Sequence, residues 1–432
     1  MRLIKYTLVL SLALLSTVVW GQMTQKGKTG TFALTNATIE TVTKGTIQNG
    51  TVIIADGKIL DVGTNVSIPA GATTIDCSGL TVYPGMIDAG TQLGLSEVGS
   101  VSLTQDFNEV GDINPHMQAL TAVNPNSVLI PVTRVNGVTT SLAMPTGGLF
   151  SGTAALINLH GYTPDQMYAG FKGMVINFPS TGRRGGWDRR SDEDIKKASE
   201  KALKQLNDVW AKAVQYHKID SAAGKGSQDY YPEMEALLPA VRGEMTVLIN
   251  VNASKDILSA LEWIEGKNIK AVFCGVSEGW RVADKIAKAK VPVITGPVLG
   301  IPNRGYDRYD AQYANPGLMA KAGVKVAIRT NDTENVRNLP YNAGFAATYG
   351  MGKEAALKAI TIVPAEIMGV ADQLGSIEKG KVANLFVTNG DPFETKTQVK
   401  HLFIAGWQIP LESRHTLLYD EFLERSPGVE KK

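Results

Sequence analysis

The feature that most constrains the fold of this chain is an alternation of short apolar runs with helical stretches between about residues 84 and 374. The runs are rich in β-branched residues, which is typical of parallel strands buried on both faces. This alternation favours a (β/α)8 barrel of the α/β class, with a doubly wound sheet as the alternative. No glycine-rich dinucleotide motif follows a predicted strand, which weakens that alternative. The predicted strands include residues 138–144, 174–178, 245–251, 270–276, 291–295 and 324–329.

Strand-rich segments flank this region on both sides. In the first segment, Asp56 and Gly57 stand between two alternating runs and are typical of a type I′ hairpin turn. Strand character returns after Gly375. The predicted strands are residues 31–35, 51–55 and 58–62 on one side, and 376–377, 382–388 and 399–405 on the other.

One long amphipathic helix is predicted over residues 191–217. Ser191 and Asp194 resemble a capping box at its start. Apolar residues recur every three or four positions, so we expect this face to pack on the barrel exterior. They are Ile195, Ala198, Ala202, Leu206, Val209 and Ala213.

The first 21 residues predict export. Arg2 and Lys5 form a short positive region, and residues 7–20 follow without a charge, ahead of the small residue Gly21. This stretch is too short for a comfortable membrane span and is typical of a signal peptide, with an uncleaved anchor as the alternative. We expect the mature chain to begin at Gln22 and to be periplasmic or secreted, with no membrane attachment.

The composition is that of an ordinary globular protein. Of 432 residues, 44% are hydrophobic, which is enough for a large core. A net charge of +2 gives no reason to expect nucleic acid as a partner. The two cysteines, Cys77 and Cys274, exclude a disulfide framework. Residues 416–432 are predicted to form a charged tail.

Three segments resemble the metal-dependent amidohydrolases, in family order and spanning about residues 30 to 410. Residues 81–92 resemble the motif Pro-Gly-Leu-Ile-Asp-x-His-x-His of the family's first barrel strand. Residues 355–369 resemble the helix after the last strand. Residues 375–385 are similar to Gly-Ser-Leu-x-x-Gly-Lys-x-Ala-Asp-Leu, where the family returns to its small domain. Among subfamilies, the chain looks closest to the imidazolonepropionase-like amidohydrolases.

The resemblance implies a (β/α)8 TIM barrel over residues 84–375. It also implies a small β-sandwich built from both chain ends, residues 30–83 and 376–415. The implied chemistry is hydrolysis of C–N bonds in rings, amides or dipeptides. In that chemistry one or two divalent ions lower the pKa of a bound water. Histidines and carboxylates at strand ends hold the ions in this family, and a final Asp also takes the water's proton.

This chain departs from the family pattern at each ligand position. Glycine has no donor atom, amide oxygens are weak zinc ligands, and asparagine cannot act as a general base at neutral pH. We therefore expect no metal and no other cofactor. We expect instead a pocket of neutral polar groups at the C-terminal face of the barrel. The positions, by alignment with the family motifs, are Gly90, Gln92, Asn250, Asn252, Gly275 and Asn331.

Two carboxylates could rebuild a catalytic site. Asp332 follows Asn331 directly, so a slip of one residue in register would restore a carboxylate. Glu278 lies just past a predicted strand end, where capping of a helix N-terminus is the alternative role. Asp88 is expected to support the first strand.

Three further side chains are candidate ligands. Of the five histidines, His116 and His160 are the two expected to approach the strand ends. A lone histidine is more often structural than a ligand. Cys274 could offer a thiolate, with a buried core cysteine as the alternative.

Two hypotheses of function remain. The first is a degenerate, metal-free amidohydrolase that acts as a ligand-binding or partner subunit. The second is a hydrolase that cleaves C–N bonds through a relocated site, with Asp332 or Glu278 as the catalytic carboxylate. The first is favoured because catalysis has to be argued from the site and not from the fold. The expected partners are a small-molecule ligand, a second copy of the chain, or an active amidohydrolase paralogue.

Overall fold

The computed structural model describes residues 26–183, 188–224, 228–302 and 304–425. The predicted signal peptide, residues 1–21, lies outside the described residues. Among the helices within those ranges, none combines the length and the apolar character needed to cross a membrane.

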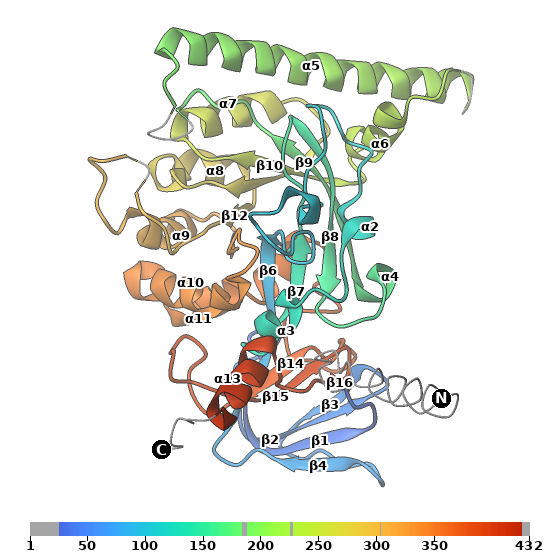
Figure 1. Ribbon diagram of the computed structural model, residues 1–432, viewed down its shortest axis with the longest axis vertical. Coiled ribbons are helices and arrows are strands. Elements are labelled where there is room, and N and C mark those ends of the chain that lie inside the picture. The colour runs from blue at the N-terminus through green and yellow to red at the C-terminus, as the bar shows by residue number, and fades with distance from the viewer. Residues whose placement is uncertain (1–25, 184–187, 225–227, 303, 426–432) are drawn as a thin grey trace, which may run out of the picture.

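Eight strands form a barrel in the order β6 to β13 (Figure 1). The last strand closes on the first, since the backbone N–H of Asn331 donates to the carbonyl of Gly90 at 3.1 Å. The predicted barrel of the α/β class is confirmed. The strands are β6 (Met86–Thr91), β7 (Val138–Ala143), β8 (Phe150–Asn158), β9 (Tyr168–Asn177), β10 (Thr246–Val251), β11 (Lys270–Gly275), β12 (Val293–Thr295) and β13 (Val326–Ile328).

The third strand departs from an all-parallel barrel. β8 pairs antiparallel with both β7 and β9, and Thr140 lies opposite Asn158. Antiparallel neighbours can be joined by short turns, so no helical crossover is needed here. The C-terminal end of β8 therefore lies beside the N-terminal end of β7, at the opposite end of the barrel from Gly90.

Alternate residues of the barrel strands point inward, as the period of two requires. On β10, Leu248 belongs to the inner cluster, whereas Val247 and Ile249 pack in the cluster that includes the outer helices. On β13, Ala327 is the inward residue. The same alternation places residues 250 and 329 on the inner side, one step closer to the mouth.

A second eight-stranded sheet combines both chain ends, as predicted. Its order is β16-β15-β14-β5-β1-β2-β3, with β4 paired to β1. Asp56 and Gly57 have φ of 50° and 77°, which agrees with the predicted type I′ turn. Residues 376–377 form no strand, a correction to the prediction. The strands are β1 (Phe32–Glu40), β2 (Thr46–Ala55), β3 (Lys58–Gly63), β4 (Thr73–Asp76), β5 (Thr81–Pro84), β14 (Leu385–Thr388), β15 (Val399–Ile404) and β16 (Trp407–Gln408).

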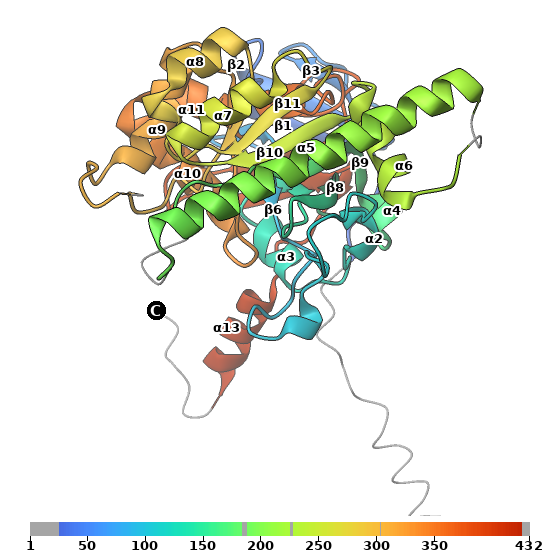
Figure 2. The same ribbon diagram turned by 90° about the horizontal axis from the view of Figure 1, so that it is seen from above.

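Helices cover the outside of the barrel (Figures 1 and 2). After the short α2 (Ala119–Ala122), α3 (Leu129–Arg134) and α4 (Pro164–Met167), the longest is α5 (Asp192–Ala223). The remaining helices are α6 (Pro232–Val241), α7 (Ser254–Ile264), α8 (Ala283–Ala289), α9 (Ala311–Lys321), α10 (Leu339–Ala346), α11 (Lys353–Ala359), α12 (Ile362–Ile367) and α13 (Arg414–Glu424). α13 occupies much of the segment predicted as a charged tail.

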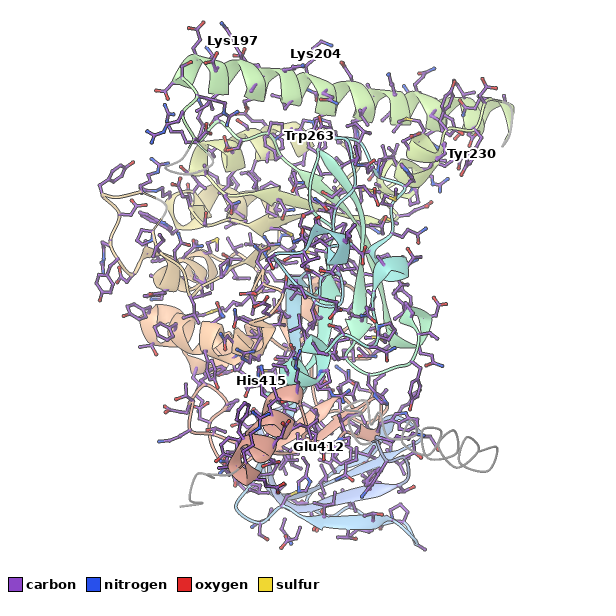
Figure 3. The ribbon with its side chains drawn as sticks, viewed as in Figure 1. Lys197, Lys204, Tyr230, Trp263, Glu412 and His415 are labelled. Atoms are coloured by element: carbon purple, nitrogen blue, oxygen red, sulfur yellow. The ribbon has the colours of Figure 1, made fainter. Side chains whose placement is uncertain are left out.

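The long helix α5 is the amphipathic helix predicted from the sequence. Ser191 caps it by accepting the backbone N–H of Asp194 at 3.0 Å. Trp210 packs against Trp263 of α7, with ring centroids 5.6 Å apart. Figure 3 shows Trp263 beneath the helix and Lys197 on its outer side. The helix therefore lies on the barrel exterior, as expected.

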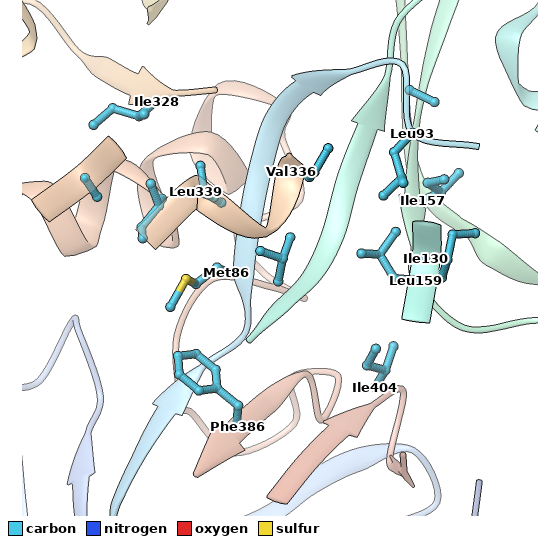
Figure 4. Close-up of a cluster of buried hydrophobic side chains, with 14 of the residues drawn as sticks. Met86, Leu93, Ile130, Ile157, Leu159, Ile328, Val336, Leu339, Phe386 and Ile404 are labelled. Carbon is cyan, nitrogen blue, oxygen red and sulfur yellow. The ribbon is translucent and has the colours of Figure 1, made fainter. Parts of the chain in front are cut away.

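One hydrophobic cluster joins the barrel to the small sheet (Figure 4). Phe386 and Ile404 come from the small sheet, Met86 and Leu159 come from the barrel side, and Ile130 comes from α3. All five side chains are buried. The two parts of the molecule therefore share a continuous core at the N-terminal end of the barrel strands.

Candidate functional site

The six positions aligned with the family's metal ligands lie at the C-terminal ends of β6, β10, β11 and β13. Besides the bond from Asn331 to Gly90, the backbone N–H of Gln92 donates to the carbonyl of Asp332 at 3.2 Å. These bonds extend the pairing of the first and last strands beyond their formal ends. The positions predicted from the family motifs are therefore gathered at one mouth of the barrel.

A buried guanidinium occupies this mouth. Arg329 directly follows β13 and is only 5% exposed. Its Nη1 lies 3.4 Å from Oδ1 of Asn250 and 3.6 Å from Sδ of Met144, both long contacts. Its Nε is buried and has no hydrogen-bond partner among the described residues. Burial lowers the pKa of Arg329, and the neighbouring Cys274 and Asp88 oppose that shift.

Arg329 is not among the site residues predicted from the sequence, although the sequence carries a signal for it. If Asn331 is assigned to the inner face of the last strand, a period of two assigns Arg329 to the same face. An arginine at the inner end of an apolar strand is unusual because a buried charge needs partners.

The glycine at position 90 makes room for this arginine. A Cβ on Gly90 would lie 2.7 Å from Sδ of Met144 and 2.9 Å from Cδ of Arg329. Distances this short require a neighbour to move. The space in front of the first ligand position is thus filled by two side chains. The prediction of an open pocket lined by all six positions stays a prediction.

The amides at the mouth form a second group. The Nδ2 of Asn250 donates to Oδ1 of Asn177 on β9 at 2.9 Å. Asn252 is exposed, and its Oδ1 would lie 2.4 Å from a Cβ on Gly275. Gly275 also has a φ of +87°, which favours glycine. The backbone conformation and the close approach of Asn252 therefore both require glycine at position 275 in this chain.

Asp88 ties the first strand to the last. Its carboxylate accepts the Thr330 hydroxyl at 2.6 Å and the backbone N–H of Gly90 at 3.2 Å. Burial raises the pKa of Asp88 to about 7, against the opposing effect of these hydrogen bonds and of Arg329. The side chain is fully buried. This arrangement agrees with the expected supporting role.

The carboxylate of Asp332 is directed to its own loop. Its Oδ1 accepts backbone N–H groups from Thr333 at 2.6 Å, Glu334 at 2.9 Å and Asn335 at 3.1 Å. These bonds stabilise the turn that leads into the short helix η3 (Val336–Asn338). The loop after β13 therefore holds this carboxylate through its own backbone.

Glu278 is held in a bidentate ion pair. Its two carboxylate oxygens lie 2.5 and 2.6 Å from the guanidinium nitrogens of Arg304. It also accepts the backbone N–H of Ser254 at 2.9 Å, so it caps α7 and not the helix it precedes. Burial opposes ionisation, but the bonds from Arg304 and Ser254 outweigh it and lower the pKa of Glu278.

The structure separates the two candidate histidines. His160 follows β8 and lies at the opposite end of the barrel, because β8 runs antiparallel to its neighbours. The expectation that it approaches the ligand positions is therefore wrong. His116 lies in the loop that pairs with the start of β8, and its Nδ1 is buried without a partner among the described residues.

Cys274 points into the barrel as part of the inner hydrophobic cluster. Burial raises the pKa of its thiol to about 11, with Arg329 opposing the shift. A thiol with this pKa is protonated at neutral pH and is a poor metal ligand. Cys274 is therefore better described as a core cysteine than as a thiolate ligand.

The donors at the mouth do not fit the divalent ions that the family's chemistry implies. Zinc in catalytic sites takes three protein ligands from imidazole, thiolate and carboxylate. Within the described ranges no group of three or more His, Cys, Asp and Glu side chains could hold a metal ion. The guanidinium of Arg329 adds a fixed positive charge at the same place, which opposes a second cation.

Comparisons with known proteins agree with the fold. The profile of the Amidohydrolase family matches residues 308–409, which include β13 and Arg329. An amidohydrolase from Thermotoga maritima MSB8 superposes with a TM-score of 0.77 at 25% identity, covering 88% of this chain and 99% of that one. Molinate hydrolase superposes with a TM-score of 0.56 at 16% identity, over 94% of this chain and 98% of that one. Residues 308–409 therefore match the Amidohydrolase family, and the chain has the fold of these amidohydrolases.

One curated relative is also similar. Amidohydrolase tasK of Hapsidospora irregularis is 24% identical over 402 residues, which is 83% of this chain. The match covers only 39% of the relative's own length. The chain thus spans about two fifths of that protein.

Proposed function

We propose that this chain is an exported, degenerate amidohydrolase that acts as a ligand-binding or partner subunit without a catalytic metal. The observation that carries the proposal is the buried guanidinium of Arg329 at the former ligand positions. A fixed cation there supplies a positive charge where the family's chemistry needs metal ions. It supplies no coordinated water whose pKa is lowered, so hydrolysis loses its nucleophile.

The surroundings of Arg329 support the same conclusion. A water-activating base should have an accessible lone pair and a pKa near the working pH. Asp332 is engaged by three backbone N–H groups, and Glu278 is paired with Arg304. Both carboxylates therefore already accept hydrogen bonds of the native fold. The exposed amide of Asn252 and the exposed Asn331 are suited to hydrogen bonding with a ligand instead.

The second candidate is a hydrolase that cleaves C–N bonds through a relocated site. The observation that favours it is the family of the similar proteins, which includes molinate hydrolase and other amidohydrolases. In this case Asp332 would have to take the proton of a water while Oδ1 holds its loop, or Glu278 would have to exchange Arg304 for a water.

A hydrolysis assay separates the two candidates. The mature chain is incubated with dipeptides, N-acyl amino acids and cyclic imides, with and without added Zn²⁺ or Mn²⁺. Our proposal expects rates at background under both conditions. Turnover that depends on the added ion would contradict the metal-free assignment. Turnover that persists with a chelator and is lost in Asp332→Asn or Glu278→Gln would support the relocated site.

A further inference from the structure

A second candidate site lies at the other end of the barrel. A cavity of about 510 Å³ opens between α3, the segment after β8 and α13. Figure 1 shows α13 beside α3 at the junction of the barrel with the small sheet. Small-molecule sites commonly have volumes of this order. The barrel separates this cavity from Arg329 at the mouth, so the two sites are distinct.

The cavity contains a buried arginine with little compensation. Arg134 ends α3 and is 8% exposed. Its Nη1 donates to the carbonyl of Leu159 at 3.3 Å, and its Nε is buried without a partner among the described residues. No described carboxylate lies within ion-pair distance of it. A buried charge left unpaired in this way is costly, so a complementary group is expected.

The other charged residues that line the cavity are also positive. Lys26 and Arg414 are the other charged side chains among the described residues that line the cavity, and no carboxylate lines it. Burial lowers the pKa of His160 to about 4, and the charge of Arg134 adds to this shift. The imidazole is therefore neutral at pH 7. The local potential of the cavity favours an anion.

The remaining walls are largely apolar. Ile130, Ile409 and Leu417 come from α3, the segment after β16 and α13 respectively. His160 packs against Trp407, with ring centroids 5.2 Å apart. A ligand that fills this space must bury apolar surface at one end and present a negative charge at the other.

We infer that this cavity binds a small amphipathic carboxylate, with the carboxylate on the guanidinium of Arg134 and the apolar part against Ile130, Ile409 and Leu417. A carboxylate matches the planar fork of arginine and leaves few acceptor sites unsatisfied. This site is independent of the function proposed for the barrel mouth.

Calorimetric titration with octanoate tests the inference, with octanamide as the neutral control of equal chain length. We expect octanoate to bind and octanamide to bind at least about tenfold more weakly, because only octanoate forms a charge-assisted pair. Arg134→Met should weaken octanoate binding by a similar factor without lowering the melting temperature. Leu417→Trp, which fills the cavity from α13, should weaken both compounds. Arg329→Met should leave both affinities unchanged.

The imidazole of His160 gives a readout that a merely structural arginine would not move. An anion on Arg134 offsets the charge that depresses the pKa of His160, so that pKa should rise when octanoate is added. His160→Gln assigns the signal in an NMR titration. The inference is overturned by a lack of octanoate binding at about 10 mM, which corresponds to negligible affinity. Equal affinity for octanamide, or undiminished binding by Arg134→Met, would also overturn it.

Discussion

A Cβ on Gly90 would stand 2.9 Å from Cδ of Arg329, so the glycine at the first ligand position and the arginine at the end of β13 are coupled. The family's histidine cannot stand at position 90 while Arg329 keeps this conformation.

This coupling predicts the stability of substitutions at position 90. Gly90→Ala should lower the free energy of unfolding by about 1–3 kcal/mol, because the added methyl overpacks the mouth. The loss should shrink in an Arg329→Ala background, as measured by urea denaturation in a double-mutant cycle. Gly305→Ala is the matched control, since a Cβ there has no atom within 4 Å. Equal losses with and without Arg329 would contradict the coupling.

The raised pKa of Asp88 predicts that the stability of the fold depends on pH. Burial raises its folded pKa to about 7 from 3.8. Between these values the folded chain holds a proton that the unfolded chain releases. Its contribution to stability should therefore fall as the pH rises from about 4 to 7, at up to about 1.4 kcal/mol per pH unit. The measurement is the difference in unfolding free energy between wild type and Asp88→Asn across this range. A difference that stays flat or grows with pH would argue against a buried, protonated Asp88.

The lowered pKa of Glu278 predicts the opposite dependence of stability on pH. Its pKa is lowered because the bonds from Arg304 and Ser254 outweigh the cost of burial. Its contribution is therefore present above its unfolded pKa of about 4.5 and is lost as the pH falls through the folded value. Glu278→Gln should destabilise the fold by about 2–4 kcal/mol at pH 7, because one partner of a buried pair is removed. Urea denaturation of this variant at pH 7 and pH 3 checks the sign. A loss that is larger at the lower pH would contradict it.

The signal-peptide pattern of residues 1–21 predicts that this segment is cleaved from the exported chain. Material recovered from the periplasm or the medium should begin at Gln22 by mass spectrometry, because residues 1–21 have the charge pattern of a signal peptide. Replacing Val9 and Leu10 with arginine should retain the precursor in the cytoplasm. Recovery of intact Met1 in a membrane fraction would indicate an anchor instead.

Much of the fold follows from local sequence signals. Asp56 and Gly57 take the left-handed conformations that their hairpin requires, and Ser191 caps α5 through its own side chain. The alternation of apolar runs identified most barrel strands. These features depend on neighbouring residues, which is why the sequence reveals them.

The features that were missed depend on contacts between distant segments. The direction of β8 is decided by its antiparallel pairing with β7 and β9. This direction places His160 at the end of the barrel opposite the predicted ligand positions. Arg329 is significant only because Gly90, more than 200 positions away in the chain, leaves room for it. The cavity around Arg134 requires α13, which sequence patterns did not predict.

The metal content of the purified mature chain tests the central claim most directly. Elemental analysis should find far less than one zinc, manganese or iron per chain. A chelator should leave the melting temperature unchanged, since no bound ion stabilises the native state. Arg329→Ala, which removes the fixed cation, should not create metal binding, because the neutral residues at the ligand positions remain. About one equivalent of metal per chain, lost on chelation together with a lower melting temperature and loss of amide hydrolysis, would contradict the account.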